Sequence, residues 1–217
     1  MNNVTGGPGG PLFDLPVREF LERTGSASPT PGGGSVAAVT GALASALVAM
    51  VARLTDGKKG YEQAWELAGE AVAHADRLTA ELQAAALEDG RSFAAYRAAL
   101  RLPKGSPDAR RARRDALAAA TRRATAAPLA IAEACAAILT LAERLAPVAN
   151  RHAVSDIGAA AHLAAAAARA ALLTAEINLS SAPDGEFFEQ ARGIAAKLRT
   201  VTAKTADAVV RVVETHI

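Results

Sequence analysis

Long apolar stretches alternate along the chain with short breaks that are rich in glycine, proline and polar residues. Residues 36–52 carry no charge and are apolar on nearly every side, which predicts a helix that is buried all round. Over residues 61–100, leucine and alanine recur near helical spacing with charges between them, which predicts an amphipathic helix. The breaks divide the chain into predicted helices at about 14–24, 35–54, 61–100, 107–145, 155–177 and 184 to near the C-terminus.

Alanine is the most abundant residue, with 57 copies among 217 residues, whereas aromatic residues make up 4%. Alanine is the strongest helix former, while sheets favour β-branched and aromatic residues. We therefore predict an all-α fold, an antiparallel bundle of about six long helices. We expect one domain over residues 14–217 after a disordered tail over residues 1–13. Helix 35–54 and the alanine-rich stretch 159–168 need more cover than one bundle supplies, which predicts a homodimer that buries them.

Charge and cysteine content argue against several kinds of partner. The net charge is +2 and the basic excess is confined to residues 101–123, so we expect no nucleic-acid partner. The apolar stretch 36–52 is shorter than the roughly 20 residues of a membrane span, so we expect no membrane partner. The single cysteine, Cys135, and the lack of a visible signal peptide predict a cytoplasmic protein. We expect no metal site, because no histidine pair has HExxH spacing and no CxxC motif is present.

The most distinctive segment leads directly into the second predicted helix and consists of Pro31, Gly32, Gly33, Gly34 and Ser35. Consecutive glycines permit positive φ angles and a close approach of the backbone to another group. The following helix N-terminus offers free N–H groups and the positive end of the helix dipole. Two interpretations stay open, namely a cradle for a ligand carboxylate or carbonyl and a flexible connector. In the first, a side chain at Gly33 would occupy the ligand's space.

Several polar residues are candidates for chemistry, each with a simpler alternative. Asp89, next to Gly90 on a core-forming helix, can serve as a general acid or base, although a solvated carboxylate is the simpler interpretation. The lysines at interhelical turns can form an anion site or be solvated; they are Lys58, Lys59 and Lys104.

Polar residues also flank the fifth predicted helix. Asn150 precedes it, Ser155 suits its N-cap, and Asp156 complements the dipole in its first turn. Asn178 lies in the predicted turn 178–183 and can cap the other end. From residue type alone, capping explains these residues.

Six segments follow one another in the order found in a known family: 28–61, which begins SPTPGGGSVAA, 89–93 (DGRSF), 102–104 (LPK), 127–129 (APL), Asn150 with Ser155 and Asp156, and 177–179 (INL). Together they resemble the formiminotransferase-cyclodeaminase C-terminal domain family, which includes stand-alone methenyltetrahydrofolate cyclohydrolases. The resemblance covers residues 14–210. It implies an all-helical dimer with a folate cleft near the glycine segment.

The resemblance also implies roles for individual residues. Asp89 matches the position of the catalytic carboxylate, and residues 31–35 become part of the folate site. Lys58, Lys59 and Lys104 become candidates for the anionic glutamate tail. Asn150, Ser155, Asp156 and Asn178 join the predicted substrate-binding set. A tetrahydrofolate derivative is the implied substrate, and no tightly bound cofactor is expected.

The predicted reaction is hydrolysis of 5,10-methenyltetrahydrofolate to 10-formyltetrahydrofolate, which a lone module of this family can perform without a coupled transferase. The alternative reaction is cyclodeamination of formiminotetrahydrofolate with release of ammonia. A non-catalytic folate-binding dimer is a third interpretation, because Thr174 and Ala175 replace the family's Asn-Val and Glu176 follows them. The scarcity of aromatic residues predicts that a bound pterin lies against small side chains and the 31–35 backbone rather than on an aromatic platform.

Overall fold

The computed structural model describes residues 12–180, 182 and 184–217, and these form helices without any strand. The α-helices are α1 (Val17–Thr24), α2 (Gly33–Thr55), α3 (Trp65–Leu100), α4 (Pro107–Leu145), α5 (Val154–Ser180) and α6 (Glu186–Glu214). Short 3-10 helices are η1 (Leu12–Asp14), η2 (Glu62–Ala64) and η3 (Arg151–Ala153). The predicted all-α class is therefore confirmed.

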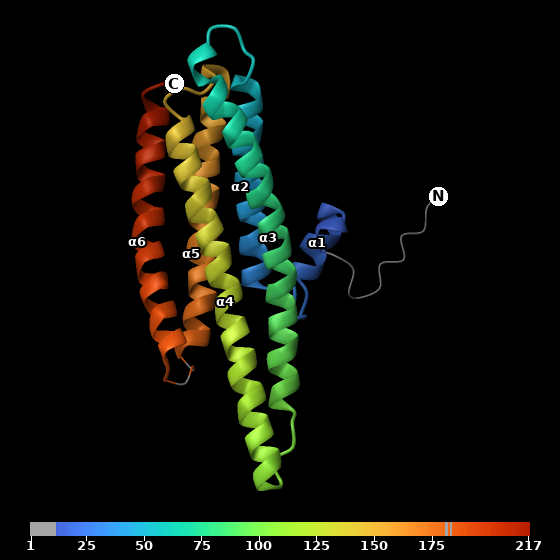
Figure 1. Cartoon of the computed structure of the whole chain (residues 1–217). Helices are drawn as coiled ribbons and strands as arrows, with labels where there is room; N and C mark the ends of the chain where they lie inside the picture. The colour runs from blue at the N-terminus through green and yellow to red at the C-terminus, as the bar shows by residue number, and fades with distance from the viewer. Residues whose placement is uncertain (1–11, 181, 183) are drawn as a thin grey trace, which may run out of the picture.

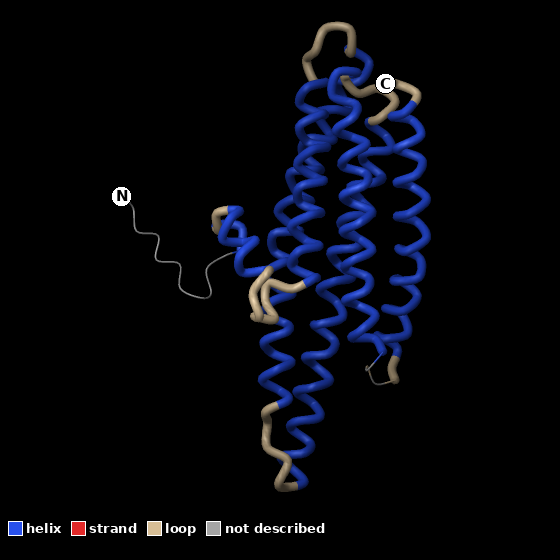
Figure 2. Tube along the Cα trace, turned by 180° about the vertical axis from the view of Figure 1, so that it is seen from behind, coloured by secondary structure: helices blue, strands red, loops and turns tan. Residues whose placement is uncertain are grey.

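Helices α2 to α5 form the central bundle, in which α2 packs on α3 and α5, and α4 packs on α3 and α5. Helix α6 covers the side formed by α4 and α5 (Figure 1). Helices α3 and α4 are the longest and continue as a hairpin beyond the other helices (Figure 1). Figure 2 shows that the loop before α2 lies part way along this long axis, beside the hairpin.

The core consists largely of alanine, as the composition suggests. Ala38, Ala44 and Ala164 are completely buried, and the larger core residues lie between them. A Cβ atom on Gly41 of α2 would stand 2.9 Å from Cys135 Sγ of α4. Small side chains thus bring the backbones of α2 and α4 close together. Burial raises the pKa of the Cys135 thiol to about 12, so this thiol stays protonated in the core at neutral pH.

Helix boundaries differ from the predicted ones mainly around α5. Ser155 is not an N-cap, because η3 runs directly into α5 and Asn150 caps η3 by accepting the His152 N–H at 3.1 Å. Asn178 is not in a turn, because α5 continues to Ser180. Helix α2 begins at Gly33 rather than Ser35, so the glycine segment supplies the first turn of the helix.

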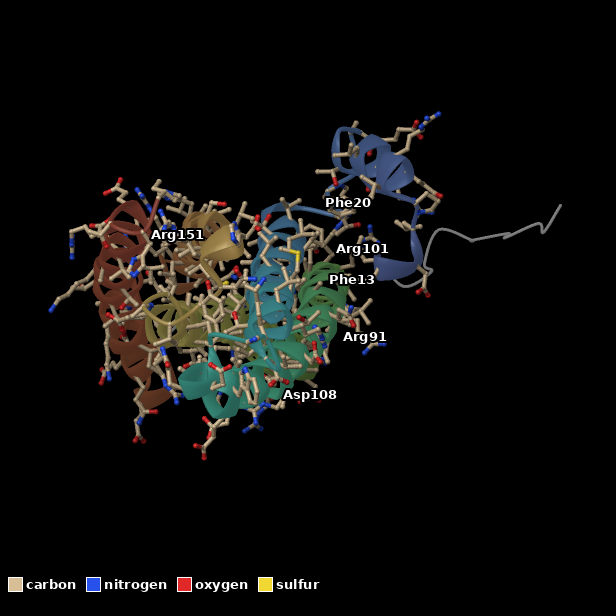
Figure 3. The ribbon with its side chains drawn as sticks, turned by 90° about the horizontal axis from the view of Figure 1, so that it is seen from above. Phe13, Phe20, Arg91, Arg101, Asp108 and Arg151 are labelled. Carbon is tan, nitrogen blue, oxygen red and sulfur yellow. The ribbon has the colours of Figure 1, made fainter. Side chains whose placement is uncertain are left out.

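The N-terminal segment is only partly described. The predicted disordered tail falls mostly on residues 1–11, outside the described residues, whereas Leu12 and Phe13 belong to η1. Helix α1 contains no buried residue and stands apart from the bundle, as the view from above shows (Figure 3).

Three helical segments are long and apolar enough to cross a membrane by length and composition alone, namely α2, α4 and residues 151–180. In the bundle, 61% of the most apolar window of α2 is buried by the chain itself. The cover predicted for residues 36–52 is therefore supplied in large part by α3 and α5.

Candidate functional site

The candidate site forms where the N-terminus of α2 meets the side of α3. Gly32 precedes α2 and offers no side chain to cap the free N–H groups of its first turn. Asp89 of α3 takes that place: its Oδ2 accepts the Ser35 hydroxyl at 3.0 Å, and the carboxylate also accepts the Ser35 backbone N–H. A carboxylate of one helix thus caps another helix at the positive end of its dipole.

Gly34 makes this contact possible. A Cβ atom built on Gly34 would stand 2.3 Å from Asp89 Oδ1 and 2.6 Å from its Cγ, so the carboxyl group occupies the place of a side chain. A Cβ atom on Gly33 would meet only Thr174 Oγ1, at 3.8 Å, which is an ordinary contact. Among the described glycines, those with left-handed φ angles lie outside the segment and are Gly57, Gly60 and Gly185. Gly34 therefore serves close approach and not a positive φ.

Burial is the main influence on the charge of Asp89. Removal from water raises the pKa of its carboxyl group, although the hydrogen bonds from the Ser35 hydroxyl and N–H act in the opposite direction. The group is half-buried and not sealed off. It is thus a stronger base than a solvated aspartate and remains within reach of a ligand.

The adjacent carboxylate, Glu88, has the opposite electrostatic character. Its Oε1 accepts hydrogen bonds from Arg123 Nε at 3.1 Å and Nη2 at 2.7 Å, and from the Ser92 hydroxyl at 3.2 Å. The bond from Arg123 lowers the pKa of Glu88. Glu88 is therefore held as an anion by its partners, which leaves Asp89 as the carboxylate suited to proton transfer. Nothing in the local sequence pattern marks Glu88 or Arg123, whereas Ser92 lies within the segment 89–93 that carries the family resemblance.

Asp89 lines a cavity of about 240 Å³ between α3, α4 and α5. The residues that line it are Asp89, Ser92, Phe93, Tyr96, Thr121, Ala124, Thr174, Ile177 and Asn178. Two of the chain's few aromatic residues, Phe93 and Tyr96, are among them. Both rings are carried by α3, on the side of Asp89, and the expectation that a bound pterin lies against small side chains and the 31–35 backbone stays a prediction.

A second groove, of about 420 Å³, lies on the other side of Ser35 between α3 and the N-terminal segment. Pro31 and Ser35 line it together with Arg23 of α1 and Arg91 of α3. In Figure 3, Arg91 extends outward from α3 at the side of the bundle where Phe13 lies. The Ser35–Asp89 contact therefore lies between the Asp89 cavity and a more open groove that carries two arginines.

Asn178 belongs to the site through α4. Its Nδ2 donates to the Ala124 carbonyl at 2.7 Å. Pro128 lies four residues after Ala124 and has no N–H group, so Ala124 lacks the usual helical donor. The predicted substrate residue thus satisfies the carbonyl that the proline leaves free and joins α5 to α4 beside the cavity.

The remaining predicted residues lie elsewhere. Asn150 donates from Nδ2 to the Leu54 carbonyl at 3.0 Å, at the far end of α2. Lys58, Lys59, Ser155 and Asp156 lie at this same end, which the 23 residues of α2 separate from Gly33 by about 33 Å.

Lys104 is exposed in the connection at the tip of the α3–α4 hairpin. One chain therefore does not bring the predicted lysines to the glycine segment, and their folate role stays a prediction. Within the described part of the chain, no three His, Cys, Asp or Glu side chains gather as a metal centre requires.

The protein is a helical bundle in which a half-buried aspartate caps a glycine-rich helix N-terminus beside a cavity. The family model described as formiminotransferase-cyclodeaminase matches residues 16–197. The chain belongs to this family.

Named relatives include two kinds of enzyme. A methenyltetrahydrofolate cyclohydrolase of Methylorubrum extorquens is 34% identical over 80% of this chain and 84% of its own length. A formimidoyltransferase-cyclodeaminase of Rattus norvegicus is 33% identical over 86% of this chain, which spans only 34% of that relative. The crystal structure of formiminotetrahydrofolate cyclodeaminase from Thermotoga maritima superposes with a TM-score of 0.85 at 26% identity, over 94% of this chain and 98% of that one.

Two helical glycines, Gly34 of α2 and Gly69 of α3, give a matched pair of substitutions. In Gly34→Ala the new Cβ atom must displace the Asp89 carboxyl group, so we expect kcat/KM for the enzyme's folate substrate to fall about 100-fold or more. In Gly69→Ala, at an exposed position of α3 where a Cβ atom meets nothing within 4 Å, we expect kcat/KM within about threefold of wild type, since alanine also favours the helix. Steady-state kinetics with circular dichroism as the folding check measures both. Equal activity of the two variants would contradict the close-approach role.

Asp89 and Glu88 should also change the pH dependence of folding stability in opposite directions. The pKa of Asp89 is raised in the folded state, so above pH 3.8 the native state binds more protons than the unfolded state. The free energy of unfolding therefore falls as pH rises through the folded pKa of Asp89. The melting temperature of Asp89→Asn relative to wild type should therefore rise with pH from about pH 3.5 to 7.

The control is Glu88→Gln. The pKa of folded Glu88 is lowered, so its contribution is present above the unfolded pKa of 4.5 and is lost as pH falls. Relative to wild type, its melting temperature should drop as pH rises through the same range. If the melting temperatures of both variants, relative to wild type, change in the same direction as pH rises, the two carboxylates do not differ as described.

Proposed function

We propose that this chain hydrolyses 5,10-methenyltetrahydrofolate to 10-formyltetrahydrofolate, with Asp89 as the group that moves protons. The observation that carries the proposal is the Asp89 carboxylate, fixed by Ser35 at the N-terminus of α2, raised in pKa by burial and facing a cavity. Family membership and the 34% identity to the Methylorubrum extorquens cyclohydrolase support the choice of reaction.

The chemistry needs one group that can accept and return a proton. The methenyl carbon bridges N5 and N10 and carries positive charge, which a nearby carboxylate stabilises. Ionised Asp89 accepts a proton from water as the water oxygen bonds to that carbon. The bond from the carbon to N5 then breaks, N5 receives one proton, the second water proton is released, and the formyl group stays on N10. A raised pKa strengthens Asp89 as the base of the first step.

Cyclodeamination is the second candidate function, because the Thermotoga maritima structure with a TM-score of 0.85 bears that name. In that reaction N10 attacks the formimino carbon on N5 and ammonia leaves. The same carboxylate would accept the proton from N10 and deliver it to the departing nitrogen. Both reactions pass through a tetrahedral carbon between the two nitrogens, so one Asp89 geometry serves either.

Assays with each substrate test the proposal and its alternatives. We expect wild-type protein to consume methenyltetrahydrofolate in a spectrophotometric assay, and Asp89→Asn to lower kcat/KM at least about 100-fold because the proton acceptor is lost. The control is Asp76→Asn, which removes an exposed carboxylate of the same helix that pairs with Arg53, and should stay within about twofold.

Each other outcome points to a different conclusion. Turnover of formiminotetrahydrofolate alone would replace the proposed reaction by the second one. Folate binding without turnover of either substrate would identify a binding protein, and near-normal turnover by Asp89→Asn would remove Asp89 from the mechanism.

We also propose that the chain acts as a homodimer that packs through the outward sides of α2 and α5. These helices contact each other, and each carries exposed apolar side chains. We call this set the α2–α5 face; its members are Leu43, Met50, Leu54, Leu173 and Ile177. Leu43 is 57% exposed and Ile177 is 71% exposed. Exposed apolar side chains on two neighbouring helices favour burial against another surface. Because Ile177 also lines the Asp89 cavity, the second copy would lie next to the site.

Light scattering coupled to size exclusion tests this assembly. Wild-type protein should have a mass of about 44 kDa, twice the 22.1 kDa chain, and Leu43→Glu should shift it toward one chain because a charge on the α2–α5 face opposes burial. Val201→Glu is the control, since Val201 is an exposed apolar residue of α6, away from this face. A monomeric wild type, or a dimer untouched by Leu43→Glu, would contradict the proposed interface.

A further inference from the structure

Thr121 of α4 is a largely buried residue whose hydroxyl group has no hydrogen-bond partner in the described part of the chain. The residue is nine-tenths buried, at 9% exposure, and lines the same cavity as Asp89. Its hydroxyl makes no hydrogen bond with the described part of the chain. A polar group in a largely buried residue that stays unpaired within the chain requires another partner, either water or a ligand.

Threonines in helices ordinarily avoid this cost through their own backbone. Nine threonines of the α-helices donate to the carbonyl four residues earlier, as Thr125 does to Thr121 at 2.9 Å. Among the described helical residues, the exceptions are Thr121 and Thr205, of which Thr121 is the more buried. The Thr121 side chain thus forgoes the bond that its helix offers to its neighbours.

The Thr121 hydroxyl is not enclosed by packing, and Thr121 lines the cavity. In the described part of the chain, one side-chain polar atom is inaccessible to solvent and also lacks a hydrogen-bond partner, namely Arg113 Nε. Because Thr121 Oγ1 also lacks a partner but is not in this state, it must be accessible. The part of Thr121 that remains accessible therefore includes its oxygen, and the accessible space beside it is the cavity lined by Asp89, Phe93 and Tyr96.

We propose that Thr121 is a substrate-contact residue, whose hydroxyl forms a hydrogen bond with the one-carbon folate bound in the Asp89 cavity. The inference rests on the proposed function for the identity of the ligand. Asp89 approaches the cavity from α3 and Thr121 from α4, so a ligand between these helices meets a carboxylate and a neutral hydroxyl. The hydroxyl can donate to a ring carbonyl or accept from a ring N–H, and thereby orients the ring without adding charge.

The test compares Thr121→Val, which keeps the shape and removes the hydroxyl, with Thr121→Ser, which keeps the hydroxyl. We expect Thr121→Val to raise KM for the folate substrate about tenfold, with a smaller effect on kcat, because a neutral hydrogen bond to the ligand is lost. Thr121→Ser should stay within about threefold. Without folate, the melting temperature of Thr121→Val should be unchanged or higher, because the unpartnered polar group is gone.

Thr125→Val is the matched control. Thr125 lies one helical turn away, is completely buried, does not line the cavity and donates its hydroxyl to a carbonyl. Its valine variant should lose stability and keep KM, which is the reverse of the pattern expected for Thr121→Val.

The outcomes separate this inference from the proposed function. A wild type that turns over neither folate overturns the proposed function. An active wild type with an unchanged KM in Thr121→Val overturns the inference alone and assigns the hydroxyl to bound water. A loss of melting temperature in Thr121→Val without folate would show a structural role and would also overturn it.

Discussion

The contact between the Asp89 carboxylate and the N-terminus of α2 is the interaction on which the site depends. A helix N-terminus has free N–H groups, and here the residue before the helix is a glycine that cannot cap them. The cap comes from α3, through the hydroxyl and the N–H of Ser35. The contact fixes α2 against α3 and also orients the carboxylate, so the stability of the helix start and the position of the reactive group share one origin.

Small side chains make that contact possible and also shape the rest of the bundle. At Gly34 the missing side chain leaves room for a carboxyl group, and at Gly41 it leaves room for Cys135 and the approach of α4. Alanine fills many of the other positions between the helices, so the backbones lie close and Asp89 is partly removed from water. The raised pKa of Asp89 follows from this packing. The outward sides of α2 and α5 instead carry large apolar side chains, so small residues underlie the core and the site, whereas leucine, methionine and isoleucine form the proposed interface.

The helices themselves could be predicted well, because periodicity and breaks are local signals. The errors occurred where a contact with another helix decides the outcome. Ser155 has the residue type of an N-cap, but the bonds of Asn150 to Leu54 and His152 start the helical path earlier. Asn178 has the residue type of a C-cap, but its amide satisfies the Ala124 carbonyl that Pro128 leaves unpaired on α4. The glycine segment was recognised as important, yet its reason is proximity to Asp89 and not a positive φ.

The sequence by itself determined the all-α class, the approximate helix ranges, the family and the two segments that meet at the site. Each of these depends on residue types and spacings that can be read along the chain. Only the tertiary structure decided that Ser35 and Asp89, 54 positions apart, touch, while Lys58, Lys59 and Asn150 lie at the opposite end of α2. The reason is that a helix is a rigid rod of about 1.5 Å per residue, so distance along it becomes distance in space. Which side chains of two such rods meet depends on their rotation and offset, and packing across the bundle sets both.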